Sequence, residues 1–194
     1  MCGITGFLDP ANRRSKAELM AIATQMACAV RHRGPDDGGA WVAAEAGVGL
    51  GHRRLSIVDL SPEGHQPMLS ADGRYVLVFN GEIYNFPALR AELESLGRGF
   101  RGHSDTEVML SAFVQWGVEA AVNRFVGMFA FAVWDQQEQI LHLVRDRAGE
   151  KPLYYGWVGE RLLFGSELKA LCAHPDWQGD VERRALALLM RYNY

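Results

Sequence analysis

The pattern of apolar and polar residues predicts both short β-strands and helices along this chain. The first apolar run, Gly3 to Leu8, predicts a buried strand almost at the N-terminus. Apolar positions from Lys16 to Val30 have helical spacing, and Ser15 followed by Glu18 three residues later matches a capping box. The next segment, Arg31 to Gly39, contains Gly-Pro and Asp-Gly steps and therefore predicts a loop.

Strands continue in the middle and at the end of the chain, and helices are grouped between them. The further predicted strands are Ala40 to Ala44, Val48 to His52, Tyr75 to Phe79, Met128 to Trp134, Gln139 to Arg145, Leu153 to Val158 and Leu162 to Phe164. The further predicted helices are Pro87 to Leu96, the Ser104-capped segment to Trp116, Glu119 to Phe125, Glu167 to Cys172 and Glu182 to Arg191. Because helices do not alternate with single strands, this order favours an α+β layered domain with antiparallel sheets over a doubly wound parallel fold.

Composition and charge exclude several classes of protein. The 194 residues predict one domain, or one domain with a fragment of another, and the net charge of -3 argues against a strongly basic nucleic-acid binder. No apolar run approaches the ~20 residues needed to cross a bilayer. Three cysteines are a poor disulfide framework and no zinc-ligand spacing occurs, so we expect a cytoplasmic protein with no metal site and no nucleic-acid or membrane partner.

Cys2 is the first candidate for chemistry. Removal of Met1 would leave Cys2 with a free α-amine beside its own thiol. One residue would then supply both a nucleophile and the base that accepts the thiol proton. From position alone, an incidental terminal cysteine remains the alternative.

Asn80-Gly81 follows the strand Tyr75 to Phe79 and has two interpretations. The dipeptide alone favours an ordinary hairpin turn. An Asn side-chain N–H and a Gly backbone N–H are also suited to an oxyanion hole for a tetrahedral intermediate.

Charged side chains that fit an amino-acid substrate also occur in the predicted strands and caps. Either Arg53 or Arg54 can clamp a carboxylate, with the other on a solvated face. The Asp105 carboxylate can accept hydrogen bonds from an α-ammonium group. Its place in the first turn of a predicted helix is explained equally well by the helix dipole.

Together these features resemble the class II glutamine amidotransferase domain, an N-terminal-nucleophile (Ntn) hydrolase, in the form fused to asparagine synthetase. The matching segments lie between residue 1 and about residue 173. They are MCGITGF, RHRGPDD, HRRLSIVDLS, GHQPM, FNGEIYN, SDTEV, GMFAFAVWD, RDRAGEKPLYY and FGSELKAL.

The resemblance implies a four-layer αββα sandwich of two mostly antiparallel sheets and hydrolysis of L-glutamine to glutamate and ammonia. It implies that Cys2 is the nucleophile and forms a glutamyl thioester, and that Asn80 and Gly81 form the oxyanion hole. The glutamine-binding residues that it implies are Arg54, Leu55, Ser56, Ile57, Val58, Glu82 and Asp105.

The resemblance also implies that two domains carry out two separate reactions. Residues 1–175 would be the glutaminase domain, which needs no cofactor, and 176–194 a C-terminal helix or linker. The ammonia would pass to a C-terminal synthetase domain that uses ATP and Mg²⁺ to convert aspartate to asparagine. These residues carry no Gly-rich pyrophosphate loop, so the ATP-dependent half is not expected in them.

Several alternatives stay open. The acceptor could instead be a sugar or a cell-surface precursor, and an inactive regulatory or assembly domain is a non-enzymatic alternative. A homodimer is compatible with the sequence, which does not fix the oligomeric state.

Overall fold

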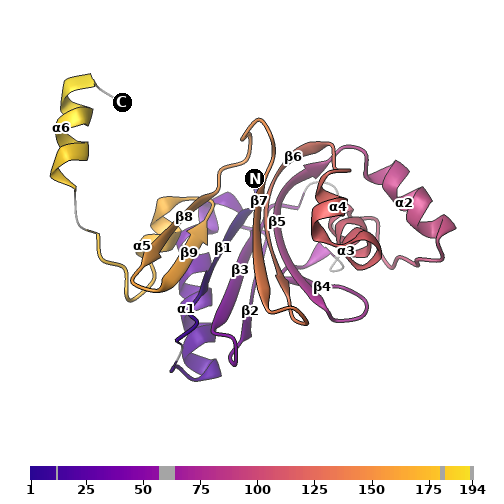
Figure 1. Ribbon diagram of the computed structural model, residues 1–194, viewed down its shortest axis with the longest axis horizontal. Helices are drawn as coiled ribbons and strands as arrows, with labels where there is room; N and C mark the ends of the chain where they lie inside the picture. The colour runs from indigo at the N-terminus through magenta and orange to yellow at the C-terminus, as the bar shows by residue number, and fades with distance from the viewer. Residues whose placement is uncertain (12, 57–63, 180–181, 193–194) are drawn as a thin grey trace.

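The computed structural model describes residues 1–11, 13–56, 64–179 and 182–192 and has four layers in the order α/β/β/α (Figure 1). Sheet A has the strand order β2-β3-β1-β9-β8, and sheet B has the order β4-β5-β6-β7. The paired strands of both sheets run antiparallel. The α+β sandwich predicted from the sequence is therefore confirmed.

The elements of each layer come from separate parts of the chain. Sheet A consists of β1 (Gly3–Leu8), β2 (Asp37–Ala43), β3 (Val48–Arg54), β8 (Tyr154–Val158) and β9 (Arg161–Gly165). Sheet B consists of β4 (Met68–Leu69), β5 (Tyr75–Ile83), β6 (Gly127–Asp135) and β7 (Ile140–Arg145). The helices are α1 (Lys16–Ala29), the 3-10 turn η1 (Arg31–Arg33), α2 (Phe86–Ser95), α3 (Asp105–Trp116), α4 (Val118–Val122), α5 (Leu168–Cys172) and α6 (Arg183–Tyr192).

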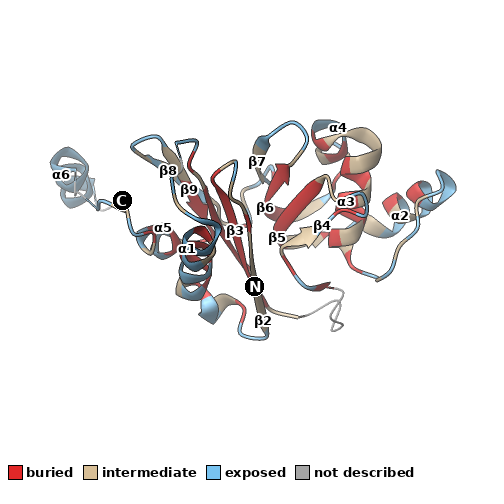
Figure 2. Cartoon of the chain, turned by 90° about the horizontal axis from the view of Figure 1, so that it is seen from below, coloured by how far each residue is buried: buried red, intermediate tan, exposed pale blue. Residues whose placement is uncertain are grey.

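Three apolar cores hold the layers together. One lies between sheet A and the helices α1 and α5, and another lies between sheet B and the helices α2 to α4. The third joins the two sheets and includes Ile4 of β1, Val78 of β5 and Trp134 of β6. Figure 2 shows the buried positions along the facing strands, with exposed positions on the outer helices. This arrangement fixes β1, which Cys2 directly precedes, and β5, which carries Asn80, on facing sheets.

The helix α1 begins where its sequence predicts. The backbone N–H of Ser15 donates to Glu18 Oε2 at 2.8 Å, and the Glu18 N–H donates to Ser15 Oγ at 3.4 Å, which completes the capping box. The predicted loop Arg31 to Gly39 was wrong at its end, because β2 begins at Asp37. Gly38 and Gly39 pair with Arg53 and His52 of β3, so an available strand edge outweighs the local turn signal.

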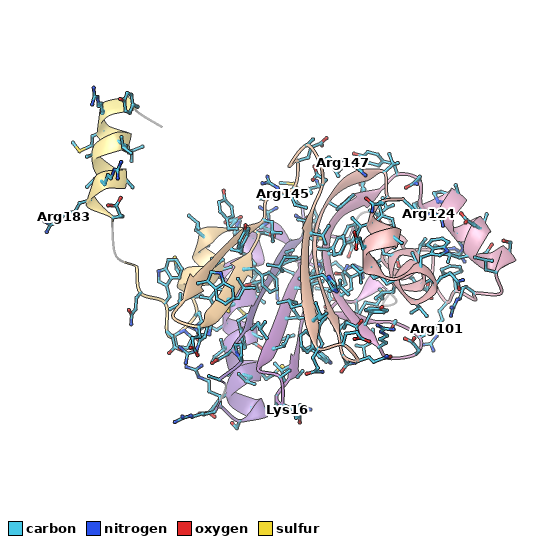
Figure 3. The ribbon with its side chains drawn as sticks, viewed as in Figure 1. Lys16, Arg101, Arg124, Arg145, Arg147 and Arg183 are labelled. Atoms are coloured by element: carbon cyan, nitrogen blue, oxygen red, sulfur yellow. The ribbon has the colours of Figure 1, made fainter. Side chains whose placement is uncertain are left out.

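The helix α6 lies apart from the four layers. It is exposed along its length, and Figure 3 shows Arg183 at its start, far from the sheets. Leu186, Leu188 and Leu189 are among its exposed apolar residues. In the described part of the chain, no helix has both the length and the apolar content needed to cross a membrane.

His52 lies fully buried between the sheets, with its Nε2 3.0 Å from the Phe79 carbonyl oxygen. Burial lowers the pKa of His52 to about 4, from the ordinary histidine value of about 6.5. Below pH 6.5 the unfolded chain binds a proton that the folded chain excludes, so stability is full above that pH and falls as the pH drops toward 4.

We expect the free energy of unfolding to fall by about 3 kcal/mol over this range through His52 alone. Urea unfolding at a series of pH values measures it, and His52→Gln should flatten the slope. His103→Gln, at an exposed position, is the matched control and should leave the slope unchanged. An equal slope in wild type and His52→Gln would refute the assignment.

Candidate active site

A cavity of about 220 Å³ lies where the N-terminus, the end of β3, the middle of β5 and the start of α3 meet. Its volume is below the roughly 300–1,000 Å³ of sites for drug-sized ligands, so it suits a smaller molecule. The residues that line it are Met1, Cys2, Arg54, Leu55, Gly64, Gln66, Phe79, Asn80, Gly81, Glu82, Ser104, Asp105, Thr106, Met128 and Lys151.

The thiol of Cys2 is held at this cavity by the backbone that follows β3. The Leu55 N–H donates to Cys2 Sγ at 3.4 Å, and the thiol in turn lies 3.7 Å from the Leu55 carbonyl oxygen. The register of β1 on β3, with Gly3 opposite Arg53, brings these two segments together. The sulfur is therefore fixed in position at the wall of a cavity.

Asn80 and Gly81 do not form the hairpin turn that the dipeptide alone favours. They continue β5 and pair with Ala130 and Phe129 of β6. A Cβ atom on Gly81 would collide with the Met128 carbonyl oxygen, so the close approach of β6 requires glycine here. The turn prediction was wrong because sheet pairing with β6 outweighs the local preference of Asn-Gly.

The Asn80 side chain is 1% exposed, and its Nδ2 has no hydrogen-bond partner among the described residues. An unpaired buried donor costs about 1–3 kcal/mol. Such a group calls for an explanation, and a ligand that accepts its hydrogen bond is one. Asn80 lines the cavity and faces the same space as Cys2.

Two carboxylates line the cavity, Asp105 at the start of α3 and Glu82 in β5. Ser104 caps α3 by accepting a hydrogen bond from the Glu107 N–H at 3.3 Å, and this places Asp105 at the helix start. Asp105 Oδ2 accepts from the Ile83 N–H at 3.1 Å. Burial raises the pKa of Asp105, and the nearby Glu82 carboxylate raises it further. The backbone hydrogen bonds from Ile83 and Thr106 lower the pKa but do not outweigh burial. The pair forms an acidic wall that favours a cation.

Arg54 lies at the cavity and Arg53 does not. Arg54 is 8% exposed, and its guanidinium packs against Gly64 so closely that no Cβ atom would fit there. Arg53 Nε donates to the Gly34 carbonyl oxygen at 3.2 Å, away from the cavity lining. Of the two arginines, Arg54 is therefore the one that lines the cavity.

The other predicted residues are only partly brought together. Leu55 lines the cavity, whereas Ser56 is absent from the lining and its N–H donates to Asp36 Oδ2 at 2.8 Å. Ile57 and Val58 lie outside the described residues.

Gln66 and Lys151 are among the cavity residues that sequence reasoning missed. Gln66 Oε1 accepts from the Phe79 N–H at 2.7 Å and so braces β5 beside Asn80. Both residues lie in segments that carry the resemblance, GHQPM and RDRAGEKPLYY, and this was the available signal.

The described residues contain no group of three His, Cys, Asp or Glu side chains arranged for a metal ion. Cys2, Cys28 and Cys172 are free thiols. The chemistry available at the cavity is therefore that of a thiol, an unpaired amide donor and side chains of both charges.

Comparisons with known proteins show the family of this chain. A family model described as a glutamine amidotransferase domain matches residues 1–194. Asparagine synthetase (glutamine-hydrolyzing) 3 of Bacillus subtilis (strain 168) is 41% identical over 96% of this chain and 30% of its own length. Asparagine synthetase (glutamine-hydrolyzing) 1 of the same organism is 39% identical over 100% of this chain and 30% of its own length. Amidase chry2 of Gibberella zeae is 37% identical over 91% of this chain and 28% of its own length.

Solved structures show the same fold. The glutamine phosphoribosylpyrophosphate (PRPP) amidotransferase from B. subtilis has a TM-score of 0.74 and 22% identity, covering 89% of this chain and 43% of that chain. The chain spans about 30% of the length of the curated relatives given above. It belongs to the glutamine amidotransferase domain family, an enzymatic domain with the N-terminal-nucleophile hydrolase fold.

Proposed function

We propose that this chain hydrolyses L-glutamine to glutamate and ammonia, with Cys2 as the nucleophile. The observation that carries the proposal is the meeting of a fixed cysteine sulfur and the unpaired Nδ2 of Asn80 at one small cavity. A thiol supplies the attack on a carboxamide, and a buried unpaired donor supplies stabilisation of the oxyanion that the attack creates.

The reaction requires removal of Met1. The free α-amine of Cys2 then accepts the thiol proton while Sγ attacks the side-chain carbonyl carbon of glutamine. The oxyanion accepts hydrogen bonds from Asn80 Nδ2 and the Gly81 N–H. The protonated amine gives its proton to the leaving nitrogen, ammonia departs, and a thioester remains. Water, deprotonated by the same amine, releases glutamate and restores the thiol.

Charge complementarity orients the substrate. Arg54 binds the α-carboxylate of glutamine, and Glu82 with Asp105 binds its α-ammonium. We assign the backbone of Leu55, which lines the cavity, to the same substrate site. Support comes from the opposite charges at two sides of the cavity and from the raised pKa of Asp105, whose burial makes a bound cation favourable.

The ammonia acceptor lies outside these residues. We assign residues 1–175 to the glutaminase domain and 176–194 to a helix or linker that leads to an ATP- and Mg²⁺-dependent synthetase domain converting aspartate to asparagine. The names of the B. subtilis relatives, and the 30% of their length that this chain spans, support this assignment.

Incubation with glutamine, without ATP or an acceptor, tests the function. The sample is first shown by intact mass to begin at Cys2, and ammonia and glutamate are then measured. We expect both products in equal amounts. A chain that begins at Cys2 and releases no ammonia from glutamine would contradict the proposal.

Asp105→Asn should have opposite effects on activity and stability. The folded chain raises the pKa of Asp105, so the stability contributed by its protonated form is lost as the pH rises through that pKa. At neutral pH the substitution should therefore raise Tm, and it should raise KM for glutamine about tenfold or more because a neutral amide does not pair with an ammonium.

Asp72→Asn is the matched control. Hydrogen bonds from Ser70 and Arg74 outweigh burial and lower the pKa of Asp72, which lies in a turn away from the cavity lining. This variant should lower Tm and leave KM unchanged. An unchanged KM in Asp105→Asn would remove Asp105 from the ammonium site.

A further inference from the structure

We infer that Glu167 is a positioning residue for Cys2, acting through the guanidinium of Arg33. The inference rests on the proposed function, in which Cys2 is both nucleophile and base. It concerns how the backbone of Cys2 is held, because the thiol and the α-amine are both attached to the Cα atom of this residue.

The backbone of β1 is paired on its β9 side up to Ile4. Beyond the Thr5–Gly165 pair, the Ser166 N–H donates to the Ile4 carbonyl oxygen at 2.9 Å, and Ser166 Oγ accepts from the Ile4 N–H at 3.0 Å. The Cys2 carbonyl oxygen lies two residues nearer the N-terminus than Ile4. It accepts a hydrogen bond of 2.9 Å from Arg33 Nε. The Arg33 side chain thus supplies a hydrogen bond to the backbone of Cys2 at the point where β9 has ended.

Arg33 is itself held by Glu167. The Arg33 side chain is 10% exposed, and its Nη1 lies 3.1 Å from Glu167 Oε1. Glu167 also contacts Lys169 Nζ at 3.0 Å and His32 Nε2 at 2.9 Å. Burial alone would raise the pKa of Glu167, but these three partners outweigh it and bring the pKa to about 2. Glu167 therefore remains an anion wherever the enzyme is folded and active.

The geometry links this ion pair to the chemistry. The peptide group is planar, so the direction of the Cys2 carbonyl fixes the rotation about its Cα–C bond. That rotation turns the α-amine and Cβ together about the Cα–C bond. Because Leu55 holds the sulfur in place, it therefore also sets the N–Cα–Cβ–Sγ torsion, which determines the distance from the α-amine to the sulfur. A misplacement of about 1 Å in a reacting group can cost a hundredfold in rate.

Glu167→Gln tests the inference, with Lys169→Gln as the matched control. Lys169→Gln also removes a charged partner from this cluster, but Lys169 is half exposed and its ammonium contacts Glu167 and His32 rather than the link between Arg33 and Cys2. Glu167→Gln should lower kcat by about 10- to 100-fold with KM nearly unchanged. Its Tm should fall as well, because the folded chain lowers the pKa of this carboxyl. Lys169→Gln should stay within about twofold of wild type. If Glu167 served only to tie the chain together, its loss would lower Tm and leave kcat of the folded enzyme intact.

Arg33→Lys is the second variant that tests the inference. A lysine keeps the charge but lacks the planar fork that reaches the Cys2 carbonyl and Glu167 at once. Because Glu167 acts through Arg33, adding Glu167→Gln to Arg33→Lys should lower kcat by no more than about twofold further. Independent, multiplicative losses in the double variant would overturn the inference.

A readout that needs no glutamine separates this inference from the proposed function. Iodoacetamide alkylation of Cys2, followed by mass spectrometry of the N-terminal peptide, should be about tenfold slower in Glu167→Gln than in Lys169→Gln, since the α-amine no longer assists loss of the thiol proton. If wild type releases no ammonia while this difference persists, the proposed function fails and the positioning role stands. Equal alkylation rates would overturn the positioning role.

Discussion

Cys2→Ala should abolish release of ammonia from glutamine, with a loss of more than about 10⁴-fold in kcat. The reason is that the cavity lining contains no second thiol: Cys28 and Cys172 are exposed and do not line it. Alanine keeps the α-amine, but an amine without the sulfur cannot form the thioester. Glutamine should still bind, because Arg54, Glu82 and Asp105 remain.

Ammonia release and calorimetric binding of glutamine measure the two parts of this prediction. Cys28→Ala is the control, since it removes an exposed thiol on α1, away from the cavity, and should leave kcat unchanged. Turnover of glutamine by Cys2→Ala at the wild-type rate would end the assignment of the nucleophile.

Asn80→Ala should lower kcat by about 10²- to 10³-fold and change KM little, because its side-chain N–H is needed only when negative charge develops on the carbonyl oxygen. Its Nδ2 has no partner among the described residues, so the substitution breaks no hydrogen bond of this atom. The Tm of the variant should therefore stay close to that of wild type.

Steady-state kinetics separate kcat from KM for this variant. Asn123→Ala is the control, since Asn123 Nδ2 bonds the Glu119 carbonyl oxygen on the surface, and it should leave kcat unchanged. A large rise in KM at constant kcat would instead place Asn80 in substrate binding.

Local signals predicted those parts of the fold that neighbouring residues determine. Ser15 and Glu18 interact within one turn, so their capping box could be read from the sequence. Asn80-Gly81 misled because β6, which forces these residues into a strand, follows much later in the chain. Charge alone did not choose between Arg53 and Arg54, whereas the resemblance implied Arg54, which is the one of the two that lines the cavity.

The support of the site was beyond sequence reasoning. Arg33 and Glu167 are separated by 134 positions, and neither has a local pattern that differs from a surface ion pair. Only the pairing of β1 with β9 brings the end of β9 beside Cys2. Seven of the fifteen residues that line the cavity were named from the sequence as site residues, and Gln66, Lys151 and six others were not.

The most direct measurement is mass spectrometry of the N-terminal peptide after the enzyme is mixed with glutamine and quenched in acid. We predict a peptide that begins at Cys2 and carries one γ-glutamyl group on its sulfur. Ammonia release by a chain that still carries Met1, or a γ-glutamyl group on any other residue, would contradict the claim that an N-terminal cysteine performs the hydrolysis.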